Sequence, residues 1–168
     1  MKAIKAIASA QAVLYDALVD QSLLEHCSPT CEQIYVGKRP GESHSQEAIN
    51  KLIVEKAYAL GHVVRLKGGD PTLFGRLAEE LAACRHAGLS VEVVPGVTSA
   101  CAAAADLQTS LTLRGVSRSV AFVTPRVGRK ELDLANEWLR VSLAAQTVVL
   151  YMAGKQARSI ANNLIAGG

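Results

Sequence analysis

The sequence predicts an α/β protein with a mostly parallel sheet. Short runs rich in valine, leucine and isoleucine alternate with longer segments that repeat apolar residues at helical spacing. Most of the short runs are apolar on both faces, as is typical of strands that helices cover on both sides. This alternation favours parallel strands joined by right-handed crossovers. With 168 residues, 49% of them hydrophobic, the chain is long enough for one domain or parts of two.

Several short runs are expected to form strands because they are rich in valine and isoleucine. They cover residues 12–16, 33–36, 62–67, 90–94, 119–124 and 147–151. Only 4% of the residues are aromatic, so we expect aliphatic side chains to fill the core.

The clearest helix is predicted by one stripe of apolar residues at helical spacing, made of Ile49, Leu52, Ile53, Ala57 and Leu60. Ser43 with Gln46 matches a capping box ahead of this stripe, and Gly61 would end the helix. We expect further helices at the N-terminus and over residues 72–86, 98–105, 131–141 and 156–165.

Composition excludes several classes of protein. The formal charge of +3 is too small to indicate nucleic-acid binding. No apolar run is long enough for a membrane span, and no signal peptide is visible. We therefore expect a cytoplasmic protein with no nucleic-acid or membrane partner.

Spacing motifs exclude further chemistry. The cysteines and histidines lack metal-binding spacing, so we expect no metal, and we expect Cys84 and Cys101 to be core thiols. P-loop, G-x-G-x-x-G and G-x-S-x-G motifs are absent from the sequence. Hydrolase, nucleotide-triphosphatase and standard NAD-binding functions therefore lack support.

The most informative segment, residues 63–71, reads as a buried strand that ends in a glycine turn. Gly68 and Gly69 would let the backbone approach a ligand closely, and Asp70 would cap a helix that Pro71 opens. Ligands of open α/β sheets bind at the carboxyl ends of strands, where this turn would lie. Taken alone, the turn fits an ordinary strand-to-helix connection as well.

Other predicted strand ends carry turns or charges. Gly96 and Gly154 each follow an apolar run and would form turns similar to the one at Gly68 and Gly69. Three such turns at the ends of strands together suggest one shared crevice. Asp16 closes the run 12–16, where capping or solvent exposure is the plainer interpretation. Arg65 lies inside an apolar strand, so it must form a structural ion pair or face a substrate cleft.

Taken together, these residues resemble the tetrapyrrole methylase family. The matching pieces occur in family order over nearly the whole chain: Tyr15-Asp16-x-Leu18-Val19, Val36-Gly37-Lys38-Arg39, Gln46-Glu47-x-Ile49-Asn50, residues 63–71, Phe74-Gly75-Arg76 with Glu79-Glu80, residues 94–100 and Tyr151-Met152. The resemblance implies two α/β domains with mostly parallel sheets, which we place at residues 1–112 and 113–168.

The resemblance also implies an activity. It is the S-adenosyl-L-methionine-dependent C-methylation of uroporphyrinogen III to precorrin-2, in sirohaem and cobalamin biosynthesis, with S-adenosyl-L-homocysteine as the other product. A homodimer is the usual assembly of the family. The alternatives are another precorrin or tetrapyrrole-family methyltransferase, and a non-catalytic α/β assembly module.

The resemblance also implies roles for single residues, at the positions that match the motifs of the family. S-adenosylmethionine would be held by Gly68, Gly69, Asp70, Leu73, Thr98, Ser99 and Met152. Asp16 matches the proton acceptor of the family, Lys38 its proton donor and Arg65 a tetrapyrrole contact.

The chain also departs from the family pattern. The family opens on a strand and a Gly-x-Gly-Pro-Gly-Asp loop and continues past the position of Gly168, so we expect a fragment truncated at both ends. Ala17, Leu113 and a short loop at residues 41–46 differ from the usual residues and affect the expected substrate contacts.

Overall fold

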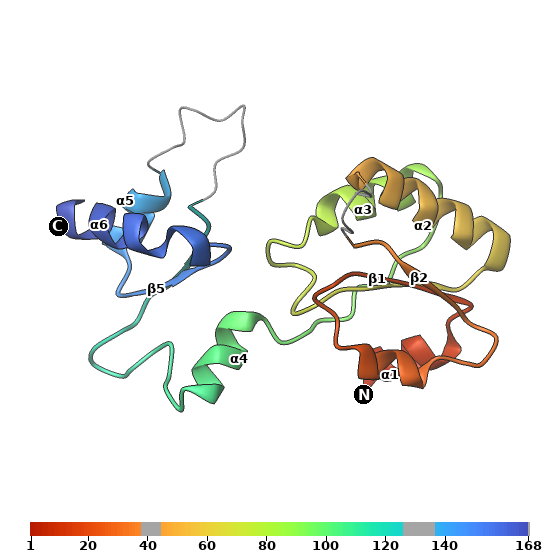
Figure 1. The fold of residues 1–168 in the computed structure, drawn as a ribbon, viewed down its shortest axis with the longest axis horizontal. Helices are drawn as coiled ribbons and strands as arrows, with labels where there is room; N and C mark the ends of the chain where they lie inside the picture. The colour runs from red at the N-terminus through yellow and green to blue at the C-terminus, as the bar shows by residue number, and fades with distance from the viewer. Residues whose placement is uncertain (38–44, 126–136, 168) are drawn as a thin grey trace. The chain divides into compact units, whose positions relative to one another are not determined.

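The computed structural model describes residues 1–37, 45–125 and 137–167. These residues form two compact units, Met1–Ser99 and Ala100–Gly168 (Figure 1). The division falls earlier than the boundary expected near residue 112. The backbone N–H of Ala100 donates to the hydroxyl of Tyr151, which ties the start of the helix α4 (Ser99–Asp106) to the second unit. The expected domain boundary stays a prediction.

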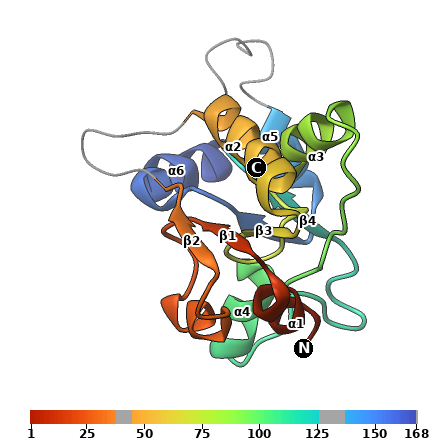
Figure 2. The same ribbon diagram turned by 90° about the vertical axis from the view of Figure 1, so that its right-hand side faces the viewer.

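The first unit is built on a three-stranded parallel sheet in the order β2-β1-β3. The strand β1 (Ala12–Tyr15) lies in the centre, between β2 (Glu32–Tyr35) and β3 (Val63–Leu66) (Figure 2). Tyr15, the last residue of β1, is in register with Tyr35 and Leu66, the last residues of its neighbours. The loops that follow the three strands therefore all begin at one edge of the sheet.

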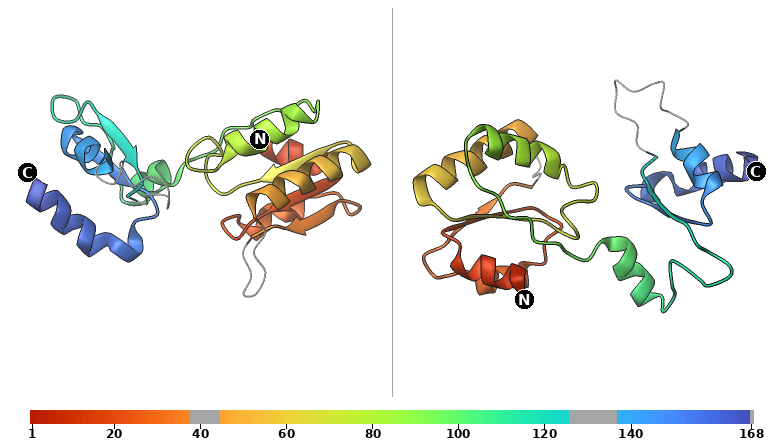
Figure 3. Two further views of the ribbon diagram at one scale, coloured as in Figure 1. Left: turned by 90° about the horizontal axis from the view of Figure 1, so that it is seen from above. Right: turned by 180° about the vertical axis from the view of Figure 1, so that it is seen from behind.

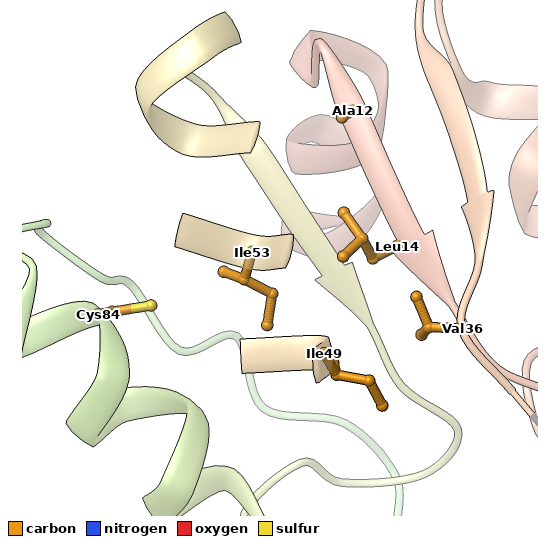
Figure 4. Close-up of a cluster of buried hydrophobic side chains, with 6 residues drawn as sticks. All are labelled: Ala12, Leu14, Val36, Ile49, Ile53 and Cys84. Carbon is orange, nitrogen blue, oxygen red and sulfur yellow. The ribbon is translucent and has the colours of Figure 1, made fainter. Parts of the chain in front are cut away.

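The side chains of β1 alternate between two cores. Val13 packs with Ile7 of α1 (Lys2–Ser9) on one face. Leu14, which is fully buried, points to the opposite face, which α2 (Gln46–Leu60) and α3 (Leu77–His86) cover (Figures 1 and 4). Each fully buried aliphatic side chain contributes about 1.5–3 kcal/mol. The predicted parallel sheet with helices on both faces is confirmed for this unit.

The start of α2 differs from the prediction. The hydroxyl of Ser45 caps the helix by accepting from the backbone N–H of Ala48 at 3.1 Å, so the capping role expected of Ser43 belongs to Ser45. Ser43 itself lies outside the described residues. Gly61, with a φ of 97°, ends the helix as predicted.

The helix α3 begins at Leu77, five residues later than predicted. Phe74 and Arg76 have left-handed backbone angles, with φ of 51° and 56°. Such angles interrupt a right-handed helix, so the segment after Pro71 forms turns instead.

The strand expected over residues 90–94 is wrong, because residues 89–98 have no regular secondary structure. Its valines have the composition of a strand, but no described strand pairs with it. Composition favours a strand only where a neighbour offers ladder hydrogen bonds. The structure also has a 3-10 helix over Gln21–His26, which the sequence patterns do not predict.

The second unit holds the parallel pair β4 (Val120–Val123) and β5 (Thr147–Leu150). The helix α5 (Glu137–Ala144) contacts β4 and α6 (Ala157–Gly167), and Figure 3 shows these elements from two sides. A short 3-10 helix, Gly154–Gln156, leads into α6.

Two of the cysteines were expected in the core. Cys84 is buried, as predicted, but Cys101 is exposed. The reason is the orientation of α4, which buries Ala100 and Ala104 and so turns the intervening position outward. Among the described residues, no helix has both the length and the apolar composition to cross a membrane.

Candidate active site

Two backbone turns cross at the carboxyl edge of the first sheet. One, residues 68–70, follows β3, and the other is formed by residues 95–98. A Cβ atom added to Gly96 would lie 2.2 Å from the carbonyl oxygen of Gly69, a distance no side chain tolerates. Gly69 has a φ of 79°, a backbone conformation that glycine adopts without steric cost. Glycine is therefore required on both sides of this contact, which we call the glycine crossing.

The carboxylate of Asp70 joins the two turns of the glycine crossing through hydrogen bonds. Its Oδ2 accepts from the backbone N–H of Gly96 at 2.9 Å, and its Oδ1 accepts from the backbone N–H of Thr72 at 2.8 Å and from the Thr72 hydroxyl. The hydrogen bond from the Thr72 hydroxyl, followed by those from the two N–H groups, lowers the pKa of Asp70. The expectation that Asp70 caps α3 is wrong, since its carboxylate instead closes its own turn and binds the neighbouring one.

A third loop, which follows β1, reaches the same edge. Asp16 begins it, and its Oδ1 accepts from the backbone N–H of Leu18 at 3.0 Å. A Cβ atom added to Gly68 would lie 2.4 Å from the carbonyl oxygen of Leu18. The loop after β1 therefore packs directly on the glycine turn after β3.

Beside these loops lies a group of four charged side chains, which we call the ion cluster: Asp16, Arg65, Lys67 and Glu80. Arg65 faces α3 because it stands opposite Leu14 in the parallel register, on the same face of the sheet. Its Nη2 donates to Asp16 Oδ2 at 2.8 Å and its Nε to Glu80 Oε1 at 3.2 Å. Lys67 Nζ donates to Glu80 Oε2 at 3.0 Å.

Three members of the ion cluster are shielded from solvent, and the charges of the cluster balance. The side chains of Arg65, Lys67 and Glu80 are 13%, 11% and 6% exposed, and that of Asp16 is 24% exposed. Arg65 Nη1 also donates to the carbonyl oxygens of Leu66 and Leu14. Within the described part of the chain, every buried side-chain nitrogen and oxygen has a hydrogen-bond partner. Buried charges persist only when paired in this way.

The structure brings together most of the residues predicted for the site in the first unit. Asp16 contacts Arg65 directly. Gly69 packs against the backbone of Val97 and Thr98. The backbone N–H of Leu73 donates to the carbonyl of Asp70 at 3.3 Å, so Leu73 belongs to the same turn.

Ser99, Met152 and Lys38 complete the set of predicted site residues. Ser99 is exposed at the start of α4. Met152 belongs to the second unit, just after β5, where it is 52% exposed and has a φ of 57°. Lys38 lies outside the described residues.

Sequence reasoning missed Glu80 as a partner of Arg65, and Lys67 as a second partner of Glu80. A signal was present, because Glu80 is four residues before the buried Cys84 and both lie on the inner side of α3. A carboxylate on the apolar side of a helix and a guanidinium inside an apolar strand each need a partner of opposite charge.

The comparisons with known proteins point to one family. A family model for the tetrapyrrole (corrin/porphyrin) methylases matches residues 1–168. The uroporphyrinogen-III C-methyltransferase of Bacillus subtilis is 39% identical over 169 residues, which cover 100% of this chain and 65% of that protein. The enzyme of the same name from Cyanidium caldarium is 40% identical over 153 residues, which cover 90% of this chain and 61% of that protein.

Solved structures give the same result. The native uroporphyrin III C-methyl transferase of Thermus thermophilus has a TM-score of 0.80 and 38% identity, covering 100% of this chain and 70% of that one. The same enzyme complexed with S-adenyl homocysteine has a TM-score of 0.79 and 38% identity, covering 99% and 69%. The chain spans 61% and 65% of the length of the two curated relatives. With a family model matched from end to end and relatives near 40% identity, the chain belongs to the tetrapyrrole (corrin/porphyrin) methylases.

Proposed function

We propose that the full-length protein transfers methyl groups from S-adenosyl-L-methionine to carbon atoms of uroporphyrinogen III, which yields precorrin-2 for sirohaem and cobalamin synthesis. The observation that carries this proposal is the glycine crossing beside the ion cluster, in a chain about 40% identical to two uroporphyrinogen-III C-methyltransferases. The crossing offers backbone for a cofactor, and the cluster offers a fixed carboxylate for proton removal.

The glycine crossing fits a nucleoside cofactor. Gly69 and Gly96 are both exposed to solvent, so the backbone of the crossing is accessible to a ligand. We assign cofactor binding to the positions implied by the resemblance, namely Gly68, Gly69, Asp70, Leu73, Thr98, Ser99 and Met152. When bound, S-adenosylmethionine supplies an electrophilic methyl group on a sulfonium centre. The turns would orient the cofactor, and such positioning provides much of the catalysis in a transfer of this kind.

Asp16 suits the role of proton acceptor. A pyrrole carbon that has gained a methyl group must lose its proton, which requires a base within reach. The N–H of Leu18 fixes one oxygen of the Asp16 carboxylate and Arg65 fixes the other. We keep Lys38 as the proposed proton donor and Arg65 as the proposed tetrapyrrole contact.

We also propose that the protein is cytoplasmic and that it forms a homodimer, the usual assembly of the family. Light scattering coupled to size-exclusion chromatography of the full-length protein should give twice the mass of one chain. A monomeric mass would contradict this assembly.

The activity is tested by product analysis. The full-length protein is incubated with uroporphyrinogen III and S-adenosyl-L-methionine, and the tetrapyrrole is identified by mass spectrometry. Addition of two methyl groups is expected. Methylation only of a later precorrin would favour another methyltransferase of the family. Failure to bind S-adenosyl-L-homocysteine in calorimetry would favour a non-catalytic assembly module.

A further inference from the structure

Glu80 is the most buried member of the ion cluster, although it comes from a helix and not from a strand end. Its side chain is only 6% exposed. Helical spacing sets it one turn before Cys84, on the side of α3 that packs against α2 and the sheet. A carboxylate in such a place would be strongly destabilising without partners.

The partners of Glu80 come from two other elements. Its Oε1 accepts from Arg65 Nε at 3.2 Å, from Lys67 Nζ at 3.1 Å and from Gln46 Nε2 at 3.3 Å. Its Oε2 accepts a further hydrogen bond from Lys67 Nζ at 3.0 Å. Glu80 thus joins α2, α3 and the end of β3 at one point.

The contacts continue from Glu80 to the proposed base. Arg65 is held at its Nε by Glu80 and at its Nη1 by backbone carbonyls, which leaves its Nη2 directed at Asp16 Oδ2. A planar guanidinium anchored at two points presents the third in a fixed direction. The orientation of Asp16 therefore depends on the anchor at Nε.

We propose that Glu80 is a positioning residue for the methyl-transfer reaction. Its carboxylate fixes Arg65 and neutralises Lys67, and Arg65 in turn holds Asp16 in one orientation. This inference rests on the proposed function, in which Asp16 accepts the proton.

Charge balance explains why the carboxylate is needed. Two cations and two carboxylates share the ion cluster. Without the charge of Glu80, both Lys67 and Arg65 have only Asp16 as an anionic partner within the cluster. The ammonium of Lys67 would then compete for the oxygens that must accept the proton, and Asp16 would lose its single orientation.

The test compares Glu80→Gln with Glu79→Gln in the full-length protein. The neighbouring Glu79 is a matched control, because its carboxylate is 48% exposed and pairs with Arg76 on the surface. We expect kcat for uroporphyrinogen III methylation to fall about tenfold to a hundredfold in Glu80→Gln, as for a misplaced catalytic group. The KM for S-adenosyl-L-methionine and the affinity for S-adenosyl-L-homocysteine should stay at wild-type values, and Glu79→Gln should behave as wild type.

Two results would overturn the inference. One is a wild-type kcat in Glu80→Gln. The other is an equal loss of kcat and cofactor affinity, because a purely structural role would affect both. A wild-type protein that binds S-adenosyl-L-homocysteine but methylates no uroporphyrinogen III would refute the proposed function first, and this inference with it.

A second variant covers the case in which Glu80→Gln does not fold. The double variant Lys67→Met, Glu80→Met removes one charge of each sign, and apolar replacement of a buried ion pair commonly preserves stability. It also removes the anchor at Arg65 Nε, so the same loss of kcat is expected. A folded double variant with wild-type kcat would contradict the role of Glu80.

Discussion

The glycine crossing and the ion cluster lie at the same edge of one sheet but are built in opposite ways. The crossing consists of backbone, with Gly69 against Gly96, and the carboxylate of Asp70 joins the two turns. The cluster consists of four charged side chains, of which Arg65, Lys67 and Glu80 are largely shielded from solvent. The crossing depends on the absence of side chains, and the cluster depends on having four of them in balance. We therefore expect the crossing to control cofactor binding and the cluster to control turnover.

The largest expected effect separates these two functions. Asp16→Ala in the full-length protein should lower turnover by about 10²–10⁴-fold, as for loss of a general base, with little change in affinity for S-adenosyl-L-homocysteine. Asp70→Ala should weaken that affinity, because the two turns lose their shared hydrogen bonds. Steady-state kinetics and calorimetry measure the two effects. Equal loss of turnover and affinity in Asp16→Ala would indicate a structural role.

The next effect concerns stability. Arg65→Ala leaves Asp16 without its ionic partner and removes one partner of Glu80, so we expect a loss of about 3–5 kcal/mol in the free energy of unfolding. Glu79→Ala breaks the exposed pair with Arg76 and should cost only about 0–1 kcal/mol. Urea denaturation of both variants checks this. Similar costs for the two would show that burial does not distinguish the cluster from a surface pair.

A smaller effect probes the crossing. Gly96→Ala adds a methyl group where the carbonyl oxygen of Gly69 leaves no room, so we expect a loss of about 1–3 kcal/mol, as for overpacking, and weaker binding of S-adenosyl-L-homocysteine. Gly154→Ala is the matched control, because an added Cβ atom there meets nothing within 4 Å. Unfolding curves measure the loss of stability, and calorimetry measures the affinity for S-adenosyl-L-homocysteine. Wild-type behaviour of Gly96→Ala would mean that the two turns do not touch.

The smallest effect is on pH dependence. Hydrogen bonds, first from the Thr72 hydroxyl, hold the pKa of Asp70 below its ordinary value of 3.8. A lowered pKa contributes stability that is fully present above the ordinary value and is lost as the pH falls through the lower value of the folded state. Below pH 3.8 the melting temperature of wild type should therefore fall more steeply than that of Asp70→Asn. The same dependence of melting temperature on pH in wild type and Asp70→Asn, measured by thermal scans, would contradict this role of the carboxylate.

The crossing was accessible from sequence because its determinants are local. Two adjacent glycines after an apolar strand indicate a tight turn, and the Pro-Gly pair marks a second one. Contact between the two turns, and the use of Asp70 to join them, became visible only when the sheet had placed them side by side. The capping role expected of Asp70 was wrong because Phe74 and Arg76 delay the helix.

The ion cluster was less accessible because it depends on tertiary register. Arg65 was recognised as a charge that needs a partner, but the partner could not be chosen from the sequence. Asp16 comes from a different strand end and Glu80 from a helix, and only the pairing of Leu14 with Arg65 sets the face on which they meet. The missing strand at residues 90–94 has a similar cause, since a strand requires a neighbour that composition does not specify.

The central claim is that the glycine crossing holds the cofactor. A crystal structure of the full-length protein with S-adenosyl-L-homocysteine tests it most directly. We predict that the ligand contacts the backbone of Gly69 and Thr98, with the carboxylate of Asp70 still bound to the N–H of Gly96. A ligand bound elsewhere, with no contact to either turn, would contradict the account.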